Sequence, residues 1–481
     1  MIQFIKQFKF MLVLCLTLLL TNFLSTPVEA APPDYSGGVA NEYTYEEAFF
    51  LDSYPITFSG KPTITERKTK DKITKTYRFN LTSKSGDKLT RSIVYETTLE
   101  NRADKGQTTS QTTIKSYSEK ITTASKAVFT LDDFQFSQAA VNDNRPASDF
   151  YSGDLVGRKI YKVTRPGAPK DYTKLITVHM TGRNMGYENF WGATETQIID
   201  YEIITNSGTT FVTSKVSDSK TKTLKYQPHD PSISSFPGGH IVVSNSEMVG
   251  KYTYAYPYYS RAGVIELSQK NATSIERLIV PKFRDLNKHW AKDAIEKLYS
   301  IGVFDETSQF FSPNTPMNRY QYTIGVLKAV DMRVYDTKSK VNSTKSIFKD
   351  IDRRDKGYSY IESAVNQGII HGITADTFKP DDPITRAQAV AVLVRALGME
   401  GRAPSPGYKT KFSDDRLIPN WAKDSAYVAY ELGLVQGDAH KRFKPQQQLT
   451  RAEASAMIQR FLEFLEHDLQ ENYREDILQM N

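Results

Sequence analysis

Three arginines recur at matching positions in the C-terminal part of the chain, and their surroundings suit the binding of an anion. Arg319, Arg386 and Arg451 follow a glycine by 17, 18 and 18 residues. Each is predicted to lie in the first turn of a helix, where free backbone N–H groups and the positive end of the helix dipole attract negative charge. A guanidinium also grips a carboxylate with two parallel hydrogen bonds. These arginines are therefore candidate anion-binding residues.

The residues around each arginine predict the helix that must position it. Thr450 and Glu453 have the spacing of a capping box, in which each side chain binds a backbone N–H at the helix start. The other two arginines have variants of this pair, namely Thr385 with Gln388 and Asn318 with Gln321. Apolar residues at helical spacing then predict a buried face: Val390, Leu393, Val394 and Leu397, and likewise Met457, Ile458, Phe461 and Leu465. If only one such arginine were present, a capped helix start with a solvated arginine would be a simpler interpretation than an anion-binding site.

The arginines belong to three tandem repeats of the chain. Each repeat opens on Phe-x-Asp, at Phe283, Phe348 and Phe412, which stand 65 and 64 residues apart. A glycine follows a helical stretch in each repeat, at Gly302, Gly368 and Gly433, and a proline comes 11 or 12 residues later, at Pro313, Pro380 and Pro445. The registers agree to within one residue, so chance similarity is a poor explanation. We place the repeats at residues 283–335, 348–401 and 412–465.

These repeats resemble S-layer homology domains, whose signature joins F-x-D, a helix, Gly, F-x-P and I-T-R-A-E. The third repeat carries Phe443-Lys444-Pro445 and Leu449-Thr450-Arg451-Ala452-Glu453; the second carries Phe378-Lys379-Pro380 and Ile384-Thr385-Arg386-Ala387-Gln388. The first is weaker, with Phe311-Ser312-Pro313 and Met317-Asn318-Arg319-Tyr320-Gln321. The resemblance implies an all-α helical triple repeat that holds exported proteins non-covalently to anionic, typically pyruvylated, secondary cell-wall polysaccharide. It also implies that Arg319, Arg386 and Arg451 contact the acidic sugar in grooves between the repeats.

The three repeats differ at positions that matter for such binding. Gly372 and Gly437 follow the repeat glycine by four residues, whereas the first repeat has Glu306 at that place. A missing glycine can block close approach of the backbone to a ligand. We therefore expect the grooves to be unequal, with the one that relies on Arg319 the weakest.

Two tryptophans are further candidates for sugar contact. Trp290 and Trp421 each stand 12 residues before the repeat glycine, where the second repeat has Lys356. Their rings offer a stacking surface for a sugar. Large aromatics at a helix start are usually buried, however, so the sequence favours core packing for both.

Residues 1–30 have the composition of a secretory signal peptide. Lys6 and Lys9 flank the start of an apolar run that extends from Phe10 to Leu20, and Ala30 is the small residue that signal peptidase prefers. The run is shorter than the roughly 20 apolar residues that span a membrane. We predict that the chain is exported and meets the membrane only through this segment. An uncleaved N-terminal anchor is the alternative.

The composition of the chain excludes several classes of protein and indicates its cellular location. The chain has 481 residues, of which 39% are hydrophobic and 24% charged, so a wholly disordered chain or a collagen-like fibre is excluded. The net charge of +7 is small and spread out, and nucleic acid is not an expected partner. The single cysteine, Cys15, excludes a disulfide scaffold and a cysteine-based zinc site. An exported chain without disulfides fits the cell wall or S-layer surface of a Gram-positive-type bacterium.

Residues 41–280 have the texture of antiparallel β structure. Tyr77, Phe79 and Leu81 alternate with polar residues, and a turn separates them from a second run at Ser92–Thr98. A clearer hairpin joins Gln197–Thr205 to Thr209–Val216. We predict a sandwich or two packed sheets; whether they form one domain or two stays open.

The β-rich half carries no recognisable catalytic motif, and the sequence predicts no metal or cofactor site. The leading hypothesis is a non-enzymatic surface protein, in which three repeats anchor a β-rich structural or binding module. A carboxylate pair for glycoside hydrolysis leaves no sequence motif, so a wall-tethered hydrolase is the first alternative. A self-assembling S-layer subunit, in contact with other surface-layer proteins, is the second.

Overall fold

A computed structural model describes residues 45–468 except 52–53, 103–105, 169–173, 228–238, 271–272, 279, 281, 306–307 and 331–345. The predicted signal peptide, residues 1–30, and Glu306 lie outside the described residues. No helix of the described part is long and apolar enough to cross a membrane.

The described part of the N-terminal half is a meander of antiparallel strands. The strands are β1 (Tyr45–Phe49), β2 (Ile56–Gly60), β3 (Thr63–Lys68), β4 (Lys72–Thr82), β5 (Lys88–Arg102), β6 (Gln107–Thr122), β7 (Val128–Asn144), β8 (Ser148–Thr164), β9 (Lys174–Asn189), β10 (Gly192–Thr205), β11 (Gly208–Gln227), β12 (Gly239–Tyr256), β13 (Arg261–Lys270) and β14 (Ser274–Arg277). They form one sheet in the order β1-β2-β4 through β13, with β3 paired to β4 and β14 to β12. Strands that are neighbours in sequence are thus mostly neighbours in space.

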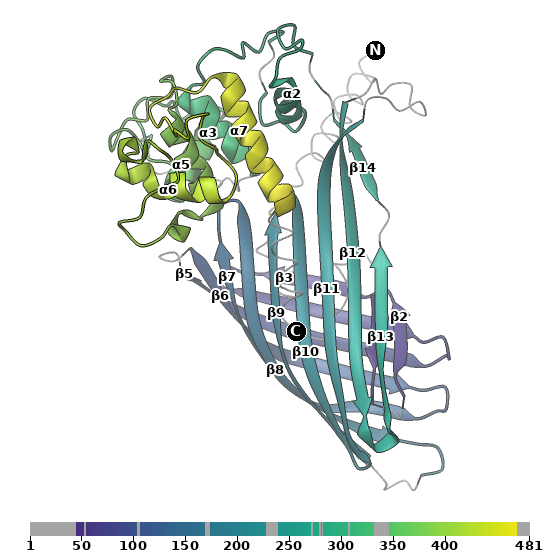
Figure 1. Ribbon diagram of the computed structural model, residues 1–481. Coiled ribbons are helices and arrows are strands. Elements are labelled where there is room, and N and C mark those ends of the chain that lie inside the picture. Colours follow the sequence, from purple (N-terminus) through teal and green to yellow (C-terminus); the bar gives the residue numbers. More distant parts are fainter. Residues whose placement is uncertain are drawn as a thin grey trace, which may run out of the picture.

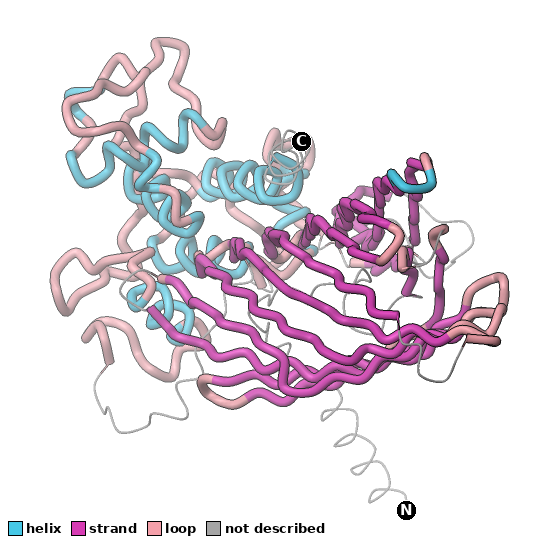
Figure 2. Tube along the Cα trace, turned by 90° about the horizontal axis from the view of Figure 1, so that it is seen from below, coloured by secondary structure: helices cyan, strands magenta, loops and turns pink. Residues whose placement is uncertain are grey.

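The sheet curves until its two edges approach each other (Figures 1 and 2). The Tyr256 hydroxyl on β12 donates a hydrogen bond of 3.3 Å to the carbonyl of Phe50, directly after β1. The ladders β5–β6 and β7–β8 each shift register by a bulge, after Val94 and after Leu131. Bulges bend a strand and increase its twist, which helps the sheet to curl. The β-rich half is therefore a single, nearly closed sheet.

The sequence predicted the strands correctly, but the sandwich is not confirmed. Tyr77, Phe79 and Leu81 are buried on β4, and the expected hairpin is β10–β11, with Thr205 paired to Gly208. Alternating apolar residues show that each strand has one buried face. A single curved sheet, whose buried side chains meet one another inside the curve, satisfies this pattern as well as two packed sheets do.

The C-terminal half places two helices in each repeat. They are α2 (Lys292–Ser300) and α3 (Arg319–Ala329), α4 (Tyr358–Asn366) and α5 (Arg386–Leu397), and α6 (Asn420–Glu431) and α7 (Arg451–Glu463). A short π-helix, η6 (Phe464–Asp468), continues α7. The helices are short, and the long turns between them include isolated antiparallel bridges, such as Asn318 with Pro383. An all-α description is therefore not confirmed. The helix faces predicted to be buried, on α5 and on α7 with the turn after it, are buried.

The sheet has a hydrophobic cluster of its own inside its curve, and a second cluster joins the end of the sheet to the repeats. Trp191 between β9 and β10, with 1% exposure, and Leu224 on β11 belong to the same buried cluster as the repeat helices. The Glu466 carboxylate, after α7, accepts a 3.0 Å hydrogen bond from the Leu224 N–H, and Asn189 donates one to the Leu465 carbonyl at 3.4 Å. In Figure 1, α7 lies at the end of these strands. The repeats and the sheet are thus docked rather than joined by a free linker.

We expect Glu466→Ala to lower the free energy of unfolding by about 1–3 kcal/mol, because the buried Leu224 N–H loses its acceptor. Urea denaturation of the full chain measures this loss. Glu431→Ala, which removes an exposed carboxylate from α6, is the matched control and should change stability by under about 0.5 kcal/mol. Equal midpoints and slopes for both variants would contradict the proposed docking contact.

Candidate functional site

The three repeats close into a ring through their arginine helices. Two residues before each arginine, backbone bonds run from repeat to repeat: Met317 N–H to Leu449 O (2.9 Å), Ile384 N–H to Met317 O (2.9 Å), and Leu449 N–H to Ile384 O (3.1 Å). We name the contacts by repeat: junction 1–2 holds Arg319, junction 2–3 holds Arg386 and junction 3–1 holds Arg451. Each arginine helix therefore begins against the next repeat around the ring.

The sequence suggested free backbone N–H groups at the helix starts, but in the structure these groups are bonded to the next repeat. The N–H of Arg386 donates to Gln447 O at 2.8 Å and that of Ala387 to Pro445 O at 3.0 Å. The other two junctions repeat this pair, from Arg319 to Asp382 and Tyr320 to Pro380, and from Arg451 to Thr315 and Ala452 to Pro313. What remains for a ligand at each junction is the guanidinium rather than the helix end.

The predicted capping boxes form in the second and third repeats but not in the first. Thr385 with Gln388 and Thr450 with Glu453 bind each other's backbone N–H groups. In the first repeat the Asn318 side chain caps the helix, but Gln321 Oε1 accepts instead from Arg451 Nη1 at 3.0 Å. Because the first repeat lacks a complete capping box, its Gln321 is instead a hydrogen-bond partner of Arg451 at junction 3–1.

Arg319 and Arg451 each bind the next repeat through their Nε–H group. Both are buried, with 7% and 8% exposure, and each Nε donates to a phenylalanine carbonyl of the next repeat: Phe378 at 3.0 Å and Phe311 at 2.9 Å. Each guanidinium also lies over the ring of that phenylalanine, at 4.8 and 4.4 Å from its centre. Their first effect is to hold neighbouring repeats together.

Arg386 differs from its two counterparts. It is half-buried, its Nη2 donates to Gln436 O at 2.7 Å, and its guanidinium lies 5.6 Å from the ring centre of Phe443. Its Nε is buried and has no hydrogen-bond partner. Burial lowers the pKa of the Arg386 guanidinium against the opposing charge of Glu453, and it lowers the pKa of Arg319 as well, so the unpartnered Nε is what sets Arg386 apart. Junction 2–3 therefore holds a cation whose charge the surrounding protein compensates incompletely.

The aspartates of the F-x-D motifs fix the turns that carry the F-x-P motifs. Asp414 accepts the N–H groups of Phe443 and Lys444 at 2.7 and 2.8 Å. Asp285 and Asp350 do the same for Phe311 with Ser312 and for Phe378 with Lys379. The middle residue of each turn has a positive φ, 56–60° at Ser312, Lys379 and Lys444, so the turn is strained without these bonds. In the sequence, the only sign of this role is that F-x-D and F-x-P occur together in every repeat.

Asp414→Ala should lower the free energy of unfolding by about 2–3 kcal/mol, since two N–H groups lose a charged acceptor. The thermal midpoint of the full chain measures the effect. Asp381→Ala removes an exposed carboxylate from the second repeat and is expected to leave the midpoint nearly unchanged. A midpoint for the Asp414 variant equal to that of the control would show that the turn does not depend on the carboxylate.

The fold itself requires glycine at positions 372 and 437. A Cβ on Gly372 would lie 2.2 Å from the Thr374 carbonyl oxygen, and one on Gly437 2.8 Å from the Lys441 backbone. Both glycines are therefore required by tight turns, whether or not a ligand approaches them.

Trp290 and Trp421 are exposed, so the expectation that they pack in the core is wrong. Their exposed fractions are 66% and 50%. The buried face of α6 is filled by smaller side chains, among them Ala422, Ala426 and Val428, which leaves Trp421 on the outside. Both rings are thus available for stacking.

A buried cluster of charges lies on the concave face of the sheet. Arg91 on β5 donates from Nη1 to Glu47 Oε2 at 2.8 Å and from Nε to Glu119 Oε2. Tyr45 donates to the same Glu47 oxygen at 2.6 Å, and Tyr161 donates to Glu119 Oε1 at 2.7 Å. All five side chains are over 90% buried. No sequence motif marks this cluster, because its members come from four different strands.

The two carboxylates of the cluster differ in acidity. Burial raises the pKa of Glu47 despite the opposing charge of Arg91. Burial also acts to raise the pKa of Glu119, but the charges of Arg91 and Lys159 and the hydrogen bonds outweigh it, so this pKa is lowered. The ion pair and hydrogen bonds thus outweigh the effect of burial on the pKa at Glu119 but not at Glu47.

Comparison with known proteins identifies the C-terminal region. The model of the S-layer homology domain matches residues 282–323, 347–390 and 411–455, and no family is named for the N-terminal half. The chain is 33% identical over 183 residues to an amylopullulanase of Thermoanaerobacterium thermosulfurigenes, which is 38% of this chain and 9% of that protein. It is 32% identical over 188 residues to the exoglucanase XynX of Acetivibrio thermocellus, covering 38% and 16%.

A surface-layer 125 kDa protein of Lysinibacillus sphaericus is 26% identical over 203 residues, covering 40% of this chain and 16% of that protein. The chain therefore matches only a small part of each of these relatives. These relatives carry names as different as amylopullulanase, exoglucanase and surface-layer protein. The C-terminal region of the chain contains three S-layer homology domains within residues 282–455.

Proposed function

We propose that this chain is an exported cell-surface protein, held non-covalently to an anionic secondary cell-wall polysaccharide by its three S-layer homology domains. The β-rich half is a non-enzymatic structural or binding module. The wall of a Gram-positive-type bacterium is the location, and acidic substituents such as pyruvate ketals are the groups recognised. S-layer homology domains bind cell-wall polymers, and surface-layer relatives support the same assignment.

The observation that carries this proposal is the state of Arg386. Its buried Nε–H has no partner, whereas the equivalent N–H groups of Arg319 and Arg451 donate to the next repeat. A carboxylate at junction 2–3 would accept this N–H and compensate the guanidinium charge. Arg386 is therefore the principal anion contact, and Arg319 and Arg451 are secondary contacts that also hold the ring together.

The remaining candidate residues take supporting roles in this proposal. The exposed rings of Trp290 and Trp421 offer stacking faces for neutral sugar residues. Gly372 and Gly437 shape turns that the ligand approaches.

The buried carboxylate pair does not favour a hydrolase. Glycosidases place two carboxyl groups on opposite sides of the scissile bond, about 5–9.5 Å apart. Here one guanidinium binds both Glu47 and Glu119, so each carboxylate is already engaged by Arg91. We therefore assign the β-rich half a structural or binding role. Because one buried cluster joins the end of the sheet to the repeats, the wall anchor holds the β-rich half in a fixed orientation.

Sedimentation of the full chain with purified cell-wall sacculi tests the proposal. Sacculi are used untreated and after acid extraction of their secondary polysaccharide. We expect the chain to sediment with untreated sacculi and to remain in solution with extracted ones. Sedimentation that survives extraction, or no sedimentation with either sample, would overturn the assignment.

A further inference from the structure

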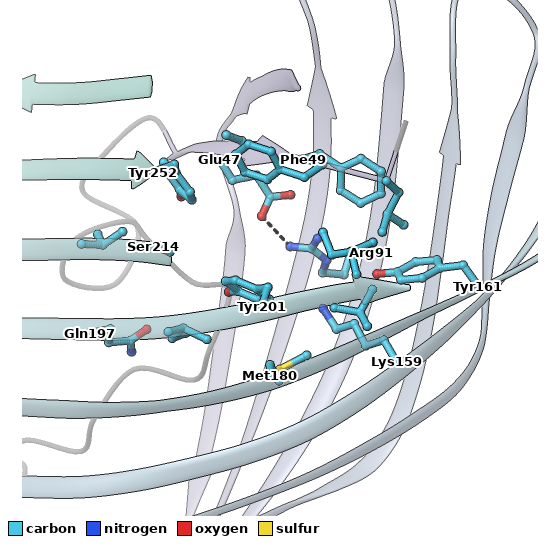
Figure 3. A pocket seen from close by; sticks show the side chains of 17 residues that line it. Glu47, Phe49, Arg91, Lys159, Tyr161, Met180, Gln197, Tyr201, Ser214 and Tyr252 are labelled. Atoms are coloured by element: carbon cyan, nitrogen blue, oxygen red, sulfur yellow. Dashed lines mark hydrogen bonds and ion pairs between the residues drawn. The ribbon is translucent and has the colours of Figure 1, made fainter. Parts of the chain in front are cut away.

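A small pocket opens on the concave face of the sheet beside the buried charge cluster (Figure 3). Glu47, Arg91 and Lys159 form the charged part of its wall, while Met180 and Tyr201 belong to a mostly apolar remainder. The volume of the pocket is about 70 Å³. This is less than half of the roughly 150 Å³ that holds a benzene ring, so the pocket receives a group of a few heavy atoms rather than a whole sugar.

One oxygen in this wall has no hydrogen-bond partner. Glu47 is 6% exposed, and its Oε2 accepts from both Tyr45 and Arg91. Its Oε1 is buried and accepts from no group. Buried polar atoms without partners are rare in folded proteins, and they are satisfied when a ligand or water supplies the missing donor.

The charges around the pocket decide which donor fits. The two carboxyl groups of Glu47 and Glu119 face two cationic groups, Arg91 and Lys159, so the formal charges of the cluster are equal in number. A charged ligand would bring an unpaired charge into a buried site, which is costly. A neutral donor would satisfy Glu47 Oε1 and leave the balance intact.

We propose that this pocket binds a neutral, largely apolar molecule through one hydroxyl group, which donates a hydrogen bond to Glu47 Oε1. The carbon chain of the ligand lies against Met180, Tyr201 and Tyr252, whose side chains face the pocket. This site belongs to the β-rich half and is independent of wall binding by the repeats.

Methyl NMR of the full chain, labelled with ¹³C at its methionine methyl groups, tests the proposal directly because Met180 lines the pocket. The probes are 1-butanol, n-butylamine and butyrate, which share a similar chain and differ in the head group; Met180→Leu assigns the signal. We expect 1-butanol to shift the Met180 methyl signal saturably, with a Kd at least tenfold lower than that of either charged probe. No saturable shift with 1-butanol, or equal binding of a charged probe, would overturn the proposal.

Two variants separate the hydrogen bond from the shape of the pocket. Glu47→Gln should raise the Kd for 1-butanol at least tenfold, whereas Glu46→Gln, on the opposite face of β1, should not change it. Ser214→Leu fills the pocket and leaves the ion pairs in place, so it should abolish the saturable shift. If Glu47→Gln does not fold, Ser214→Leu still tests the proposal. Undiminished 1-butanol binding by folded Glu47→Gln, or by Ser214→Leu, would contradict the site.

Discussion

Replacing Arg91 with methionine is expected to lower the free energy of unfolding by about 3–5 kcal/mol at neutral pH. The variant leaves Glu47 and Glu119 buried without their shared cation, and removing one partner of a buried ion pair has this order of cost. Urea denaturation of the full chain measures it. The control, Arg78→Met, removes an exposed arginine from β4 and should cost under about 0.5 kcal/mol.

The pH dependence of this loss follows from the pKa of Glu119. In the fold this pKa is lowered, so the ionised carboxylate contributes stability above its unfolded pKa, and that stability is lost as the pH falls through the folded pKa. Without Arg91, burial instead penalises the ionised form. The difference between the wild-type chain and Arg91→Met should therefore narrow as the pH falls from 7 towards the ordinary carboxyl range of about 4.

A second set of substitutions separates lost charge balance from lost packing. The quadruple variant Glu47→Gln, Arg91→Met, Glu119→Gln and Lys159→Met removes the four buried charges of the cluster. It should be more stable than Arg91→Met alone, because no carboxylate is left buried without a cation. A loss that is independent of pH and equal in the two variants would show that Arg91 acts only by filling space.

Replacing Arg386 with alanine should weaken binding to the wall polysaccharide by about tenfold to a hundredfold. One hydrogen bond to a charged group is worth roughly 1.5–3 kcal/mol. Because Arg386 is only half-buried and its Nε makes no bond within the ring, whereas the Nε of Arg319 and that of Arg451 do, most of its loss should appear in affinity rather than stability. Calorimetric titration of the full chain with purified polysaccharide measures the affinity, and the thermal midpoint measures the stability.

Matched variants at the other junctions sharpen this comparison. Arg451→Ala should lower the thermal midpoint more than Arg386→Ala does, since Arg451 also binds Phe311 and Gln321. Arg386→Lys keeps the charge but lacks the Nε–H, and it should recover only part of the affinity. Full affinity in Arg386→Ala with an intact fold would show that the anion is bound elsewhere.

Local structure in this chain could be predicted from the sequence, because it depends on residues close together. Thr450 with Glu453 predicts a helix start, and the alternation at Tyr77, Phe79 and Leu81 predicts a strand with one buried face. Alternation reports burial but not what covers the buried face. A curved single sheet therefore could not be distinguished from a sandwich.

The contacts that distinguish the sites could not be predicted in this way. Arg91 and Glu119 face each other only because β5 and β6 pair in one register, and Glu47 reaches them across the curvature of the sheet. Likewise, the three arginines look equivalent in the sequence. Ring closure sets Arg386 apart, because it satisfies the Nε of Arg319 and Arg451 and leaves that of Arg386 free.

The most direct test of anion recognition is the affinity of the full chain for the same purified wall polysaccharide before and after its carboxyl groups are chemically reduced to alcohols. Reduction removes the negative charge and retains the sugar backbone. The account predicts measurable binding to the intact polymer and loss of at least tenfold in affinity after reduction. Equal affinity for the two polymers would contradict the central claim that a guanidinium of the ring binds an acidic group of the wall.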